Sequence, residues 1–384
     1  SVPSGASTGV HEALELRDRD SARFGGLGVT LAVQNVNGEI HSLLTGKDWN
    51  QETLDQALIE CDGRKNKSRL GANAILGVSV AFAKAVARER GIELYEYFGS
   101  LADQLVYQIP QPMFNVINGG KHADSGLDFQ EFMIGPVMFD SIHEKIRVAS
   151  EIIYTLKSLL QKKGYSIGLG DEGGFAPKLA QGNEEALAVI EEAILQSGYT
   201  FDQIKIGIDV AASSFYHDGM YKFTIEGREV SMSRLELVSY YKKLVVSHPI
   251  IAIEDGFSED DFEGFFILQK EIGDTITIVG DDLTVTNTER IDMAISKNAI
   301  NSVLIKLNQI GTVSETVEAI MKTKKAGLIP FVSHRSGETT DTSISDLAVG
   351  LSCAYIKSGS LARGERVCKY NRLMEIEDTI KYLS

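Results

Sequence analysis

The first part of the chain carries apolar positions at the spacing of helices, in segments separated by glycine and asparagine. Residues 51–63 (QETLDQALIECDG) predict an amphipathic helix that stops at Asp62 and Gly63. Residues 71–87 are mostly apolar or small and lead into charged residues and Gly91, so they predict a buried helix with a glycine stop. This part of the chain is therefore predicted to be mostly helical.

The pattern changes at residues 109–119 (IPQPMFNVING), where two prolines and an Asn-Gly turn predict a boundary. Beyond residue 200, short apolar runs recur, each followed by a helical stretch: IKIGID, IIAIED, ITIVGDD, SVLIKLNQ and LIPFVSHRS. Strands that alternate with helices favour parallel βαβ units. We therefore predict an α/β protein, with a first domain over residues 1–106 and a barrel domain over residues 107–384.

Each of these runs ends in a polar residue suited to chemistry. In order, and including the later run SCAYIK, they are Asp209, Glu254, Asp281, Lys306, His334 and Lys357. After a first gap of 45 residues, the spacing of 23 to 28 residues matches one strand, one helix and their loops. A single acid at a strand end is usually a helix cap or a solvated charge. Six such strand ends are typical of a TIM-like barrel, whose site lies at the carboxyl ends of its strands.

Three carboxylates at one barrel mouth form an all-oxygen site that suits Mg²⁺ rather than Zn²⁺. The predicted ligands are Asp209, Glu254 and Asp281. Asp255 and Asp282 follow two of them, and strand alternation predicts that they point away from the site. The lysines at the next strand ends face this site, where metal charge would lower the pKa of a lysine enough for it to act as a base.

Two further motifs add candidate residues. GGKHADSGLDFQEFM contains His122 and Glu131, and GLGDEGGFAP contains Glu172. Two carboxylates that share a proton have one raised pKa, which suits general-acid catalysis, although an ordinary acidic turn also explains the second motif. The segment Ser333–Gly337 places Arg335 in a glycine-flanked turn, a candidate clamp for phosphate or carboxylate.

The overall charge limits the partners. The chain has 38 Lys and Arg residues against 53 Asp and Glu residues, and its net charge of −15 disfavours nucleic acid and anionic membranes. Its three cysteines are far apart and form no metal-binding pattern, which favours a reducing, cytoplasmic setting. Neither an 18-residue apolar run nor a signal-peptide pattern is present, so we predict no membrane span. A small-molecule substrate is expected.

Taken together, these motifs resemble the enolase family along essentially the whole chain. The matching segments, in family order, are VPSGASTG, NKSRLGANAILGVS, FNVINGGKHA, QEFM, GDEGGFAP, DVAASSFY, IED, GDDLTVTN, KLNQIGT, SHRSGETTDT and ARGERVCKYN. The resemblance implies a TIM-like barrel with irregular first strands, preceded by a smaller N-terminal α+β cap domain. It also implies a glycolytic and gluconeogenic hydro-lyase with phosphopyruvate hydratase activity. Such an enzyme interconverts 2-phosphoglycerate and phosphoenolpyruvate with two Mg²⁺ per site, in the cytoplasm, and usually as a homodimer.

By matching motif, the resemblance assigns roles to individual residues. Three carboxylates would hold one Mg²⁺: Asp209, Glu254 and Asp281. Lys306 would take the C2 proton, giving an intermediate with a doubly charged carboxylate stabilised by Mg²⁺, and Lys357 would lie beside that carboxylate. Glu172, with its pKa raised by Glu131 beside it, would protonate the departing C3 hydroxyl. The residues that would surround the hydroxymethyl and phosphate ends of the substrate are His122, His334, Arg335 and Ser336.

The opening segment SVPSGASTG gains a role from the same resemblance. By composition it predicts only a frayed terminus, but in the family it is a mobile lid whose serine, matching Ser4, closes onto the second Mg²⁺. Members also carry about 35 residues of cap-domain strands ahead of this loop, so we expect the sequence to be an excerpt. Asp124 and Gly256 stand where many relatives have glycine and proline, and neither change removes a catalytic group.

Two other functions fit part of the pattern. A related Mg²⁺-dependent enzyme that dehydrates sugar acids would share the metal site and the base. Arg335, Ser336 and Glu172 argue against it, because they suit a phosphorylated substrate with a β-hydroxyl. A noncatalytic structural or surface-binding role is the second alternative, and a dehydration assay with 2-phosphoglycerate distinguishes all three.

Overall fold

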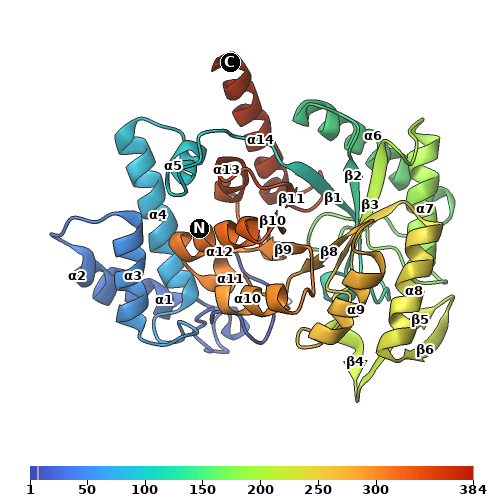
Figure 1. Cartoon of the computed structure of the whole chain (residues 1–384), viewed down its shortest axis with the longest axis horizontal. Coiled ribbons are helices and arrows are strands. Elements are labelled where there is room, and N and C mark those ends of the chain that lie inside the picture. Colours follow the sequence, from blue (N-terminus) through green and yellow to red (C-terminus); the bar gives the residue numbers. More distant parts are fainter. Residues whose placement is uncertain (7, 384) are drawn as a thin grey trace.

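The structure is a computed structural model that describes residues 1–6 and 8–383. Its N-terminal part is helical, as the periodicity predicts, and lies to one side of the molecule (Figure 1, blue to cyan). α3 begins at a capping box between Asn50 and Thr53 and ends at Gly63, whose φ of 69° stops a right-handed helix. Gly91, with φ 65°, ends α4 in the same way. The helical elements are η1 (Phe24–Gly26), α1 (Thr30–Asn35), η2 (Val36–Ile40), α2 (His41–Leu44), α3 (Gln51–Asp62), α4 (Ala72–Arg90) and α5 (Leu94–Ser100).

The strands expected for the cap domain are assigned to residues ahead of this sequence, and the part of the domain that the structure describes is helical. Across the described residues before Gln111, β pairing is limited to an isolated bridge between Ser4 and Gly337. That bridge ties the opening segment to the barrel domain rather than to a sheet of its own. The mostly helical character predicted from periodicity is confirmed.

Within the described residues, eight strands close a barrel at the centre of the molecule (Figure 1). They are β1 (Gln111–Asn118), β2 (Glu131–Pro136), β3 (Ile204–Asp209), β7 (Ile250–Glu254), β8 (Thr277–Gly280), β9 (Ser302–Ile305), β10 (Ile329–Ser333) and β11 (Tyr355–Lys357). Around the barrel their order is β1-β11-β10-β9-β8-β7-β3-β2. β2 runs antiparallel to both β1 and β3, whereas the other neighbouring strands are parallel. The predicted TIM-like barrel with irregular first strands is confirmed.

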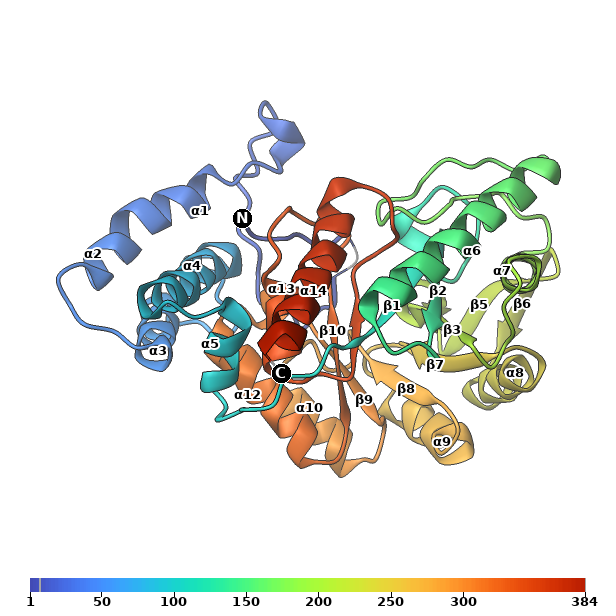
Figure 2. The same ribbon diagram turned by 90° about the horizontal axis from the view of Figure 1, so that it is seen from above.

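Helices cover the outside of the barrel, and in the view from above α6 to α8 lie on the right while α13 and α14 appear in the middle of the picture (Figure 2). Side-chain caps start several of them: Ser141 accepts from the amide of Glu144 at α6, and Asn287 accepts from two amides at α10. The elements are η3 (Gly120–His122), α6 (Ile142–Lys162), α7 (Asn183–Gln196), η4 (Ala212–Phe215), α8 (Arg234–Ser247), α9 (Phe262–Ile272), α10 (Thr288–Ser296), α11 (Leu307–Ile310), α12 (Val313–Lys325), α13 (Ser343–Gly350) and α14 (Gly364–Leu383).

A small antiparallel sheet explains the first, longer gap between strand ends. It consists of β4 (Tyr216–His217), β5 (Met220–Ile225) and β6 (Arg228–Met232), and it precedes α8. Tyr221 and Phe223 of β5 are buried against the aromatic rings of Phe215 and Tyr240. The insertion therefore lengthens the connection between β3 and β7, which still pair in parallel in the barrel.

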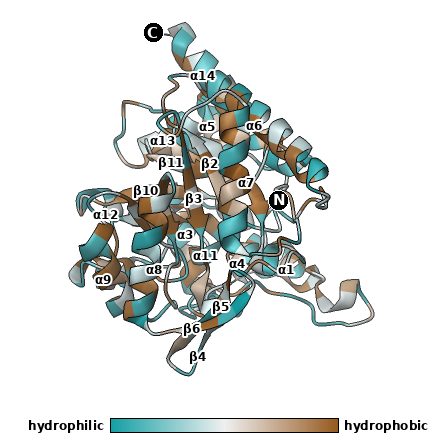
Figure 3. Cartoon of the chain, turned by 90° about the vertical axis from the view of Figure 1, so that its right-hand side faces the viewer, coloured by the Kyte–Doolittle hydropathy of each residue, from teal (hydrophilic) through white to brown (hydrophobic). Residues whose placement is uncertain are grey.

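Apolar side chains fill the barrel and the layer between the barrel and its helices. The interior cluster contains Met113, Met133, Ala252, Val279, Leu304 and Phe331. Hydrophobic residues follow the strands, while the outer helices alternate hydrophobic and hydrophilic positions (Figure 3). None of the helices in the described ranges is both long and apolar enough to cross a membrane.

The helical part docks on the barrel through buried polar groups at the start of α12. The carboxylate of Asp55 accepts from the amide and the hydroxyl of Ser314 at 2.8 and 2.7 Å. The hydroxyl of Ser79 accepts from the amide of Val313 at 2.9 Å. These contacts fix α3 and α4 to the barrel domain, and the preceding segment has its own contact with that domain, where the amide of Ala13 donates to the carbonyl of Gln309 at 2.8 Å.

Candidate active site

The strand ends bring most of the predicted residues to one cavity. Asp209 ends β3 and Lys357 ends β11, while Asp281, Lys306 and His334 directly follow β8, β9 and β10. The predicted residues that line the cavity are His122, Glu131, Glu172, Asp209, Asp281, Lys306, His334, Arg335, Ser336 and Lys357. Parallel strands end at the same rim of a barrel, which is why residues up to 148 positions apart meet there (Asp209 to Lys357).

Glu131 joins this rim because its strand runs the other way. It is the first residue of β2, and the antiparallel register places it opposite Asp209, the last residue of β3. The start of β2 therefore lies where its neighbours end. Sequence motifs predicted that Glu131 belongs to the site, but only the reversed strand explains its position.

The three predicted metal ligands contact the ammonium groups of two lysines. The Nζ atom of Lys357 lies 2.8 Å from Glu254 Oε2 and 3.8 Å from Asp209 Oδ2. Asp281 contacts Lys306 Nζ at 2.5 Å and the side-chain amide of Gln309 at 2.7 Å. Because Lys357 stands between Asp209 and Glu254, these carboxylates and Asp281 do not form one tight cluster. Glu254 is 1 % exposed and does not line the cavity.

The expectation that Asp255 and Asp282 point away from the site is wrong. Oxygen atoms of Asp255, Asp281 and Asp282 lie within 4.8 Å of one another. Strand alternation ends at Asp255, whose φ of 43° is left-handed. Its two carboxylate oxygens accept from the amides of Asp281 and Asp282 at 2.8 Å each. Asp255 therefore holds the turn that presents Asp281, and Asp282 lines the cavity.

The donor set fits a hard divalent cation. Asp209, Glu254 and Asp281 are buried and offer only oxygen atoms. Burial, followed by the negative charge of Asp209, raises the pKa of Glu254 well above its usual range. Such a concentration of negative charge is what added positive charge would relieve. The acidic cluster of His122, Glu131 and Glu172 is the other compact group on this rim.

The carboxylates around the two lysines raise their pKa values, and the lowering expected from bound Mg²⁺ stays a prediction. Burial lowers the pKa of Lys306, but the charges of nearby carboxylates, Asp281 first and then Glu254, together make the net shift upward. Burial is likewise outweighed at Lys357, where Glu131 and Glu254 hold the pKa well above its usual range. The sequence predicted that the lysines lie at strand ends, but it could not predict how many carboxylates surround each ammonium group.

The acid pair is organised around His122. Its Nδ1 atom lies 3.3 Å from Glu172 Oε1 and 3.8 Å from Glu131 Oε1. Asn115 Nδ2 donates to the other oxygen of Glu172 at 2.8 Å, and Lys357 Nζ donates to Glu131 at 3.0 Å. Every close neighbour of Glu172 is thus a potential donor, which favours its ionised form.

The raised pKa in this pair belongs to Glu131, contrary to the prediction for Glu172. Burial, followed by the charge of Glu172, raises the pKa of Glu131 to about 8. Burial opposes ionisation of Glu172 as well, but His122 and His334 outweigh it and hold the pKa of Glu172 well below its usual range. These opposite shifts favour a state at neutral pH in which the pair carries one proton, on Glu131.

The loop that carries Glu172 depends on two glycines. A Cβ at Gly170 would lie 2.6 Å from the Asn118 Cβ atom, and a Cβ at Gly174 would lie 2.8 Å from Asn118 Oδ1. Asn118 Oδ1 instead accepts from the amide of Gly174 at 3.0 Å. The glycines of GDEGG thus allow the loop to approach β1 and place Glu172 at the rim.

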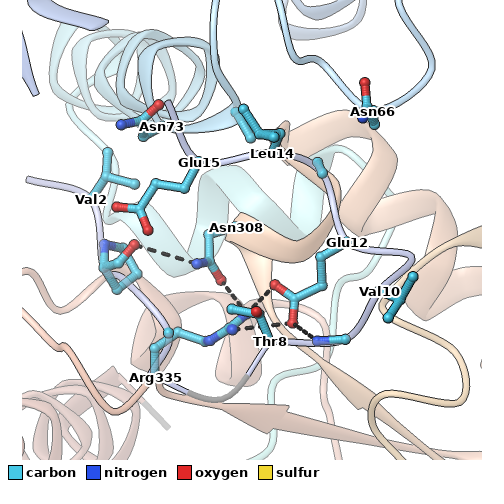
Figure 4. Close-up of a pocket in the computed structure, with 15 residues that line it drawn as sticks. Val2, Thr8, Val10, Glu12, Leu14, Glu15, Asn66, Asn73, Asn308 and Arg335 are labelled. Carbon is cyan, nitrogen blue, oxygen red and sulfur yellow. Dashed lines mark hydrogen bonds and ion pairs between the residues drawn. The ribbon is translucent and has the colours of Figure 1, made fainter. Parts of the chain in front are cut away.

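The opening segment covers the phosphate-clamp candidate. Arg335 meets the carboxylate of Glu12 and the side-chain oxygen of Asn308 (Figure 4). Ser336 Oγ accepts from the amide of Ala6 at 2.6 Å. A Cβ at Gly5 would lie 2.0 Å from Arg335 Nη2, so the segment passes this guanidinium only because Gly5 has no side chain. Beside it, a cavity of about 370 Å³ opens between the segment and the start of α4.

Comparison with protein-family models accounts for nearly the whole chain. The model of the enolase N-terminal domain matches residues 1–98, and the model of the enolase C-terminal TIM barrel domain matches residues 106–383. The chain belongs to the enolase family. Membership implies a lyase-type enzyme that depends on Mg²⁺, in agreement with the acidic groups at the barrel rim.

One residue matched to the enolase family motifs lies apart from the others. Ser4 does not line the cavity that holds the carboxylates. Its hydroxyl donates to Glu15 at 2.9 Å and accepts from Arg17 at 2.8 Å, while its backbone pairs with Gly337. In this conformation the Ser4 hydroxyl contacts its own segment. Asp124 is 99 % exposed in its side chain and lies 3.5 Å from Lys178.

Several residues contact the site without having been predicted to. Glu12 pairs with Arg335, Asn115 donates to Glu172, and Arg366 donates to His334. Asn115 and Arg366 lie inside FNVINGGKHA and ARGERVCKYN, segments that the sequence singled out without giving them a role. Gly256, the other departure, contributes its carbonyl oxygen, which accepts from the hydroxyl of buried Tyr241 at 2.8 Å.

Proposed function

We propose that this chain catalyses the reversible removal of water from 2-phosphoglycerate to give phosphoenolpyruvate. The observation that carries the proposal is one cavity lined by an amine, a carboxyl pair and a guanidinium. Lys306 supplies the amine, Glu131 and Glu172 supply the pair, and Arg335 supplies the guanidinium. Proton abstraction, loss of a hydroxyl and recognition of phosphate need these three kinds of group.

Asp209, Glu254 and Asp281 would hold Mg²⁺. When bound, Mg²⁺ would place fixed positive charge among these carboxylates, which favours the neutral amine of Lys306 and stabilises negative charge on the substrate carboxylate. Asp255 supports this set through the two amides that it binds. The matched role of Ser4 as a ligand of a second ion stays a prediction, and it requires the segment to move.

Lys306 would remove the proton from C2 of the substrate. Its side chain is 11 % exposed, so it reaches the cavity while most of it is shielded from water. Lys357, 2 % exposed, would donate to the substrate carboxylate and so oppose the charge that builds up there. Electrons from the broken C2–H bond then form the double bond between C2 and C3 as the hydroxyl leaves C3.

The departing hydroxyl needs a proton to leave as water. Glu131, His122 and Glu172 form a continuous group that holds one proton, and we assign its delivery to Glu172, in line with the family motif. His334 lies 3.5 Å from Glu172 and lines the same cavity. At the other end, Arg335 and Ser336 would bind the phosphate, and Arg335 offers a planar fork that suits it.

The test is an absorbance assay of the enol phosphate product, with 2-phosphoglycerate, Mg²⁺ and the purified chain. We expect absorbance to rise, to stop on addition of EDTA, and to be absent with Lys306→Ala. Asp274→Asn, at an exposed site on the barrel, is the matched control and should be fully active. Activity on an unphosphorylated sugar acid instead would support the alternative dehydratase, and a folded but inactive chain would support the noncatalytic role. A homodimer and a cytoplasmic location also remain predictions.

A further inference from the structure

Arg366 is buried at the start of α14 and has no catalytic role in the function proposed above. It is 1 % exposed and is one of the largest fully buried side chains of the protein. Its Nη1 atom contacts His334 Nδ1 at 2.7 Å and donates to the carbonyl of Arg335 at 2.6 Å. Its Nη2 atom donates to the carbonyls of Ser336 and Asp171 at 2.6 and 3.1 Å.

The partners of this guanidinium are unusual for a buried cation. Buried charges are normally paired with an opposite charge. Within the described part of the chain, Arg366 forms one ion pair, with the Glu365 carboxylate 3.7 Å from its Nε atom. Nε makes no hydrogen bond to any described residue. The four acceptors belong to two loops, the turn at 334–336 and the loop that carries Glu172. An apolar side chain could fill this buried space equally well, so the set of hydrogen bonds indicates that Arg366 has a further role.

The contact with His334 determines where that ring carries its proton. A guanidinium has donors and no acceptor, so Nδ1 of His334 must present its lone pair to Arg366. The proton of the neutral ring is then on Nε2, which has no hydrogen bond among the described residues and lies 3.5 Å from Glu172 Oε1. His334 lines the cavity, so this N–H is free to meet a bound ligand.

We propose that Arg366 is a positioning residue that fixes His334 as the neutral Nε2–H tautomer, so that the ring offers the cavity a hydrogen-bond donor. Through the carbonyls of Arg335 and Ser336 it also holds the turn that carries the phosphate clamp. The tautomer stands on the geometry of this structure, whereas its effect on dehydration rests on the function proposed above. There, the N–H would hydrogen-bond the hydroxyl that leaves C3, next to Glu172.

The electrostatics around His334 agree with a neutral ring. Burial is the main reason that the pKa of His334 lies well below its usual range. Glu172 opposes this shift, and the positive charges of Arg366, Lys357 and Lys306 support it. A second proton on the ring would occupy Nδ1 and place two donors face to face at 2.7 Å. The ring should therefore keep one proton across the neutral pH range.

The test is a long-range proton–nitrogen correlation spectrum of the ¹⁵N-labelled chain without substrate, with His334 assigned through His334→Gln. We expect Nε2 protonated and Nδ1 unprotonated from about pH 6 to pH 9. An ammonium group cannot span four acceptors, so in Arg366→Lys we expect a mixture of both neutral tautomers of the His334 ring. Arg363→Lys, at an exposed position one residue before α14, is the matched control and should give the wild-type spectrum.

Two results would overturn the proposal: a wild-type ring protonated on Nδ1, or a folded Arg366→Lys variant with an unchanged His334 spectrum. The first needs no variant, so the proposal stays testable if Arg366→Lys does not fold. With 2-phosphoglycerate, Arg366→Lys should lower kcat by about tenfold or more and change KM far less. If the wild type shows the expected tautomer but does not turn over this substrate, the proposed function fails and the role of Arg366 in fixing the ring stands.

Discussion

Glu12 and Arg335 are 323 positions apart in the chain, yet the two oxygens of Glu12 meet the two terminal nitrogens of Arg335 at 2.9 and 3.1 Å. The side chains are 8 and 2 % exposed, so this is a buried, two-point ion pair. It connects the opening segment to the turn that follows β10 (Figure 4). The position of the phosphate-clamp candidate thus depends on a residue outside the barrel domain.

Removal of the charge of Glu12 should destabilise the protein substantially. In Glu12→Gln the buried guanidinium of Arg335 loses its two-point carboxylate partner, which costs about 3 kcal/mol of unfolding free energy. Glu15→Gln is the control, because Glu15 pairs with Arg17 where both side chains are more than a quarter exposed. That change should cost less than about 1 kcal/mol. Urea unfolding of both variants measures the difference, and equal costs would show that the buried pair adds no stability.

The raised pKa of Glu131 predicts a pH dependence of stability. The folded protein keeps this proton up to about pH 8, whereas the unfolded chain releases it near the ordinary glutamate pKa of 4.5. The folded state therefore binds more protons in this window, and its unfolding free energy must fall as pH rises from about 4.5 to about 8. Glu131→Gln cannot release a proton and should show a flatter profile.

The measurement is the urea midpoint of unfolding of the wild type and of Glu131→Gln at pH 5, 6.5 and 8 in the presence of EDTA. These pH values span the window in which the two profiles should differ. Asp282, whose pKa is also raised to about 8, is present in both and does not affect the comparison. Glu318→Gln, an exposed change on α12, should follow the wild type. Parallel profiles for wild type and Glu131→Gln would mean that Glu131 does not hold the proton.

Mg²⁺ binding should depend on the carboxylates of the rim. In Asp281→Asn the side chain keeps its shape but loses its charge, and we expect Mg²⁺ affinity to fall by about two orders of magnitude. Calorimetry on the whole chain measures this affinity directly. Asp274→Asn removes one negative charge at an exposed position and should bind as the wild type does. An unchanged affinity in Asp281→Asn would remove Asp281 from the ligand set.

Local pattern predicted many of the elements. IKIGID forms β3, IIAIE forms β7 with Glu254 at the last position, and the apolar segment at 71–87 forms the N-cap and most of α4. Alternation and helical spacing are properties of neighbouring residues, so they could be recognised without the rest of the fold. The spacing of the polar residues also predicted that six strand ends lie at the same rim of the barrel, because most βα units have a similar length.

The features that sequence reasoning missed depend on contacts between distant segments. The left-handed φ of Asp255 arises where its carboxylate binds two amides of the next strand end, which alternation cannot foresee. The upward pKa shifts of Lys306 and Lys357 depend on how many carboxylates surround each ammonium group. Arg366 lies in the segment ARGERVCKYN, which the sequence matched to the family. The role proposed for it could be inferred only from the structure, in which the turn at 334–336 lies beside the start of α14.

The most direct test of the proposed chemistry is NMR of 2-phosphoglycerate in D₂O with Mg²⁺ and each of three proteins. The wild type should exchange the C2 hydrogen with solvent and form phosphoenolpyruvate. Lys306→Ala removes the base and should do neither. Glu172→Gln removes only the later acid, so exchange should persist while product formation falls by a factor on the order of 10² or more. Exchange by a folded Lys306→Ala, or loss of exchange in a Glu172→Gln variant that binds substrate and Mg²⁺ normally, would contradict the assignment of base and acid.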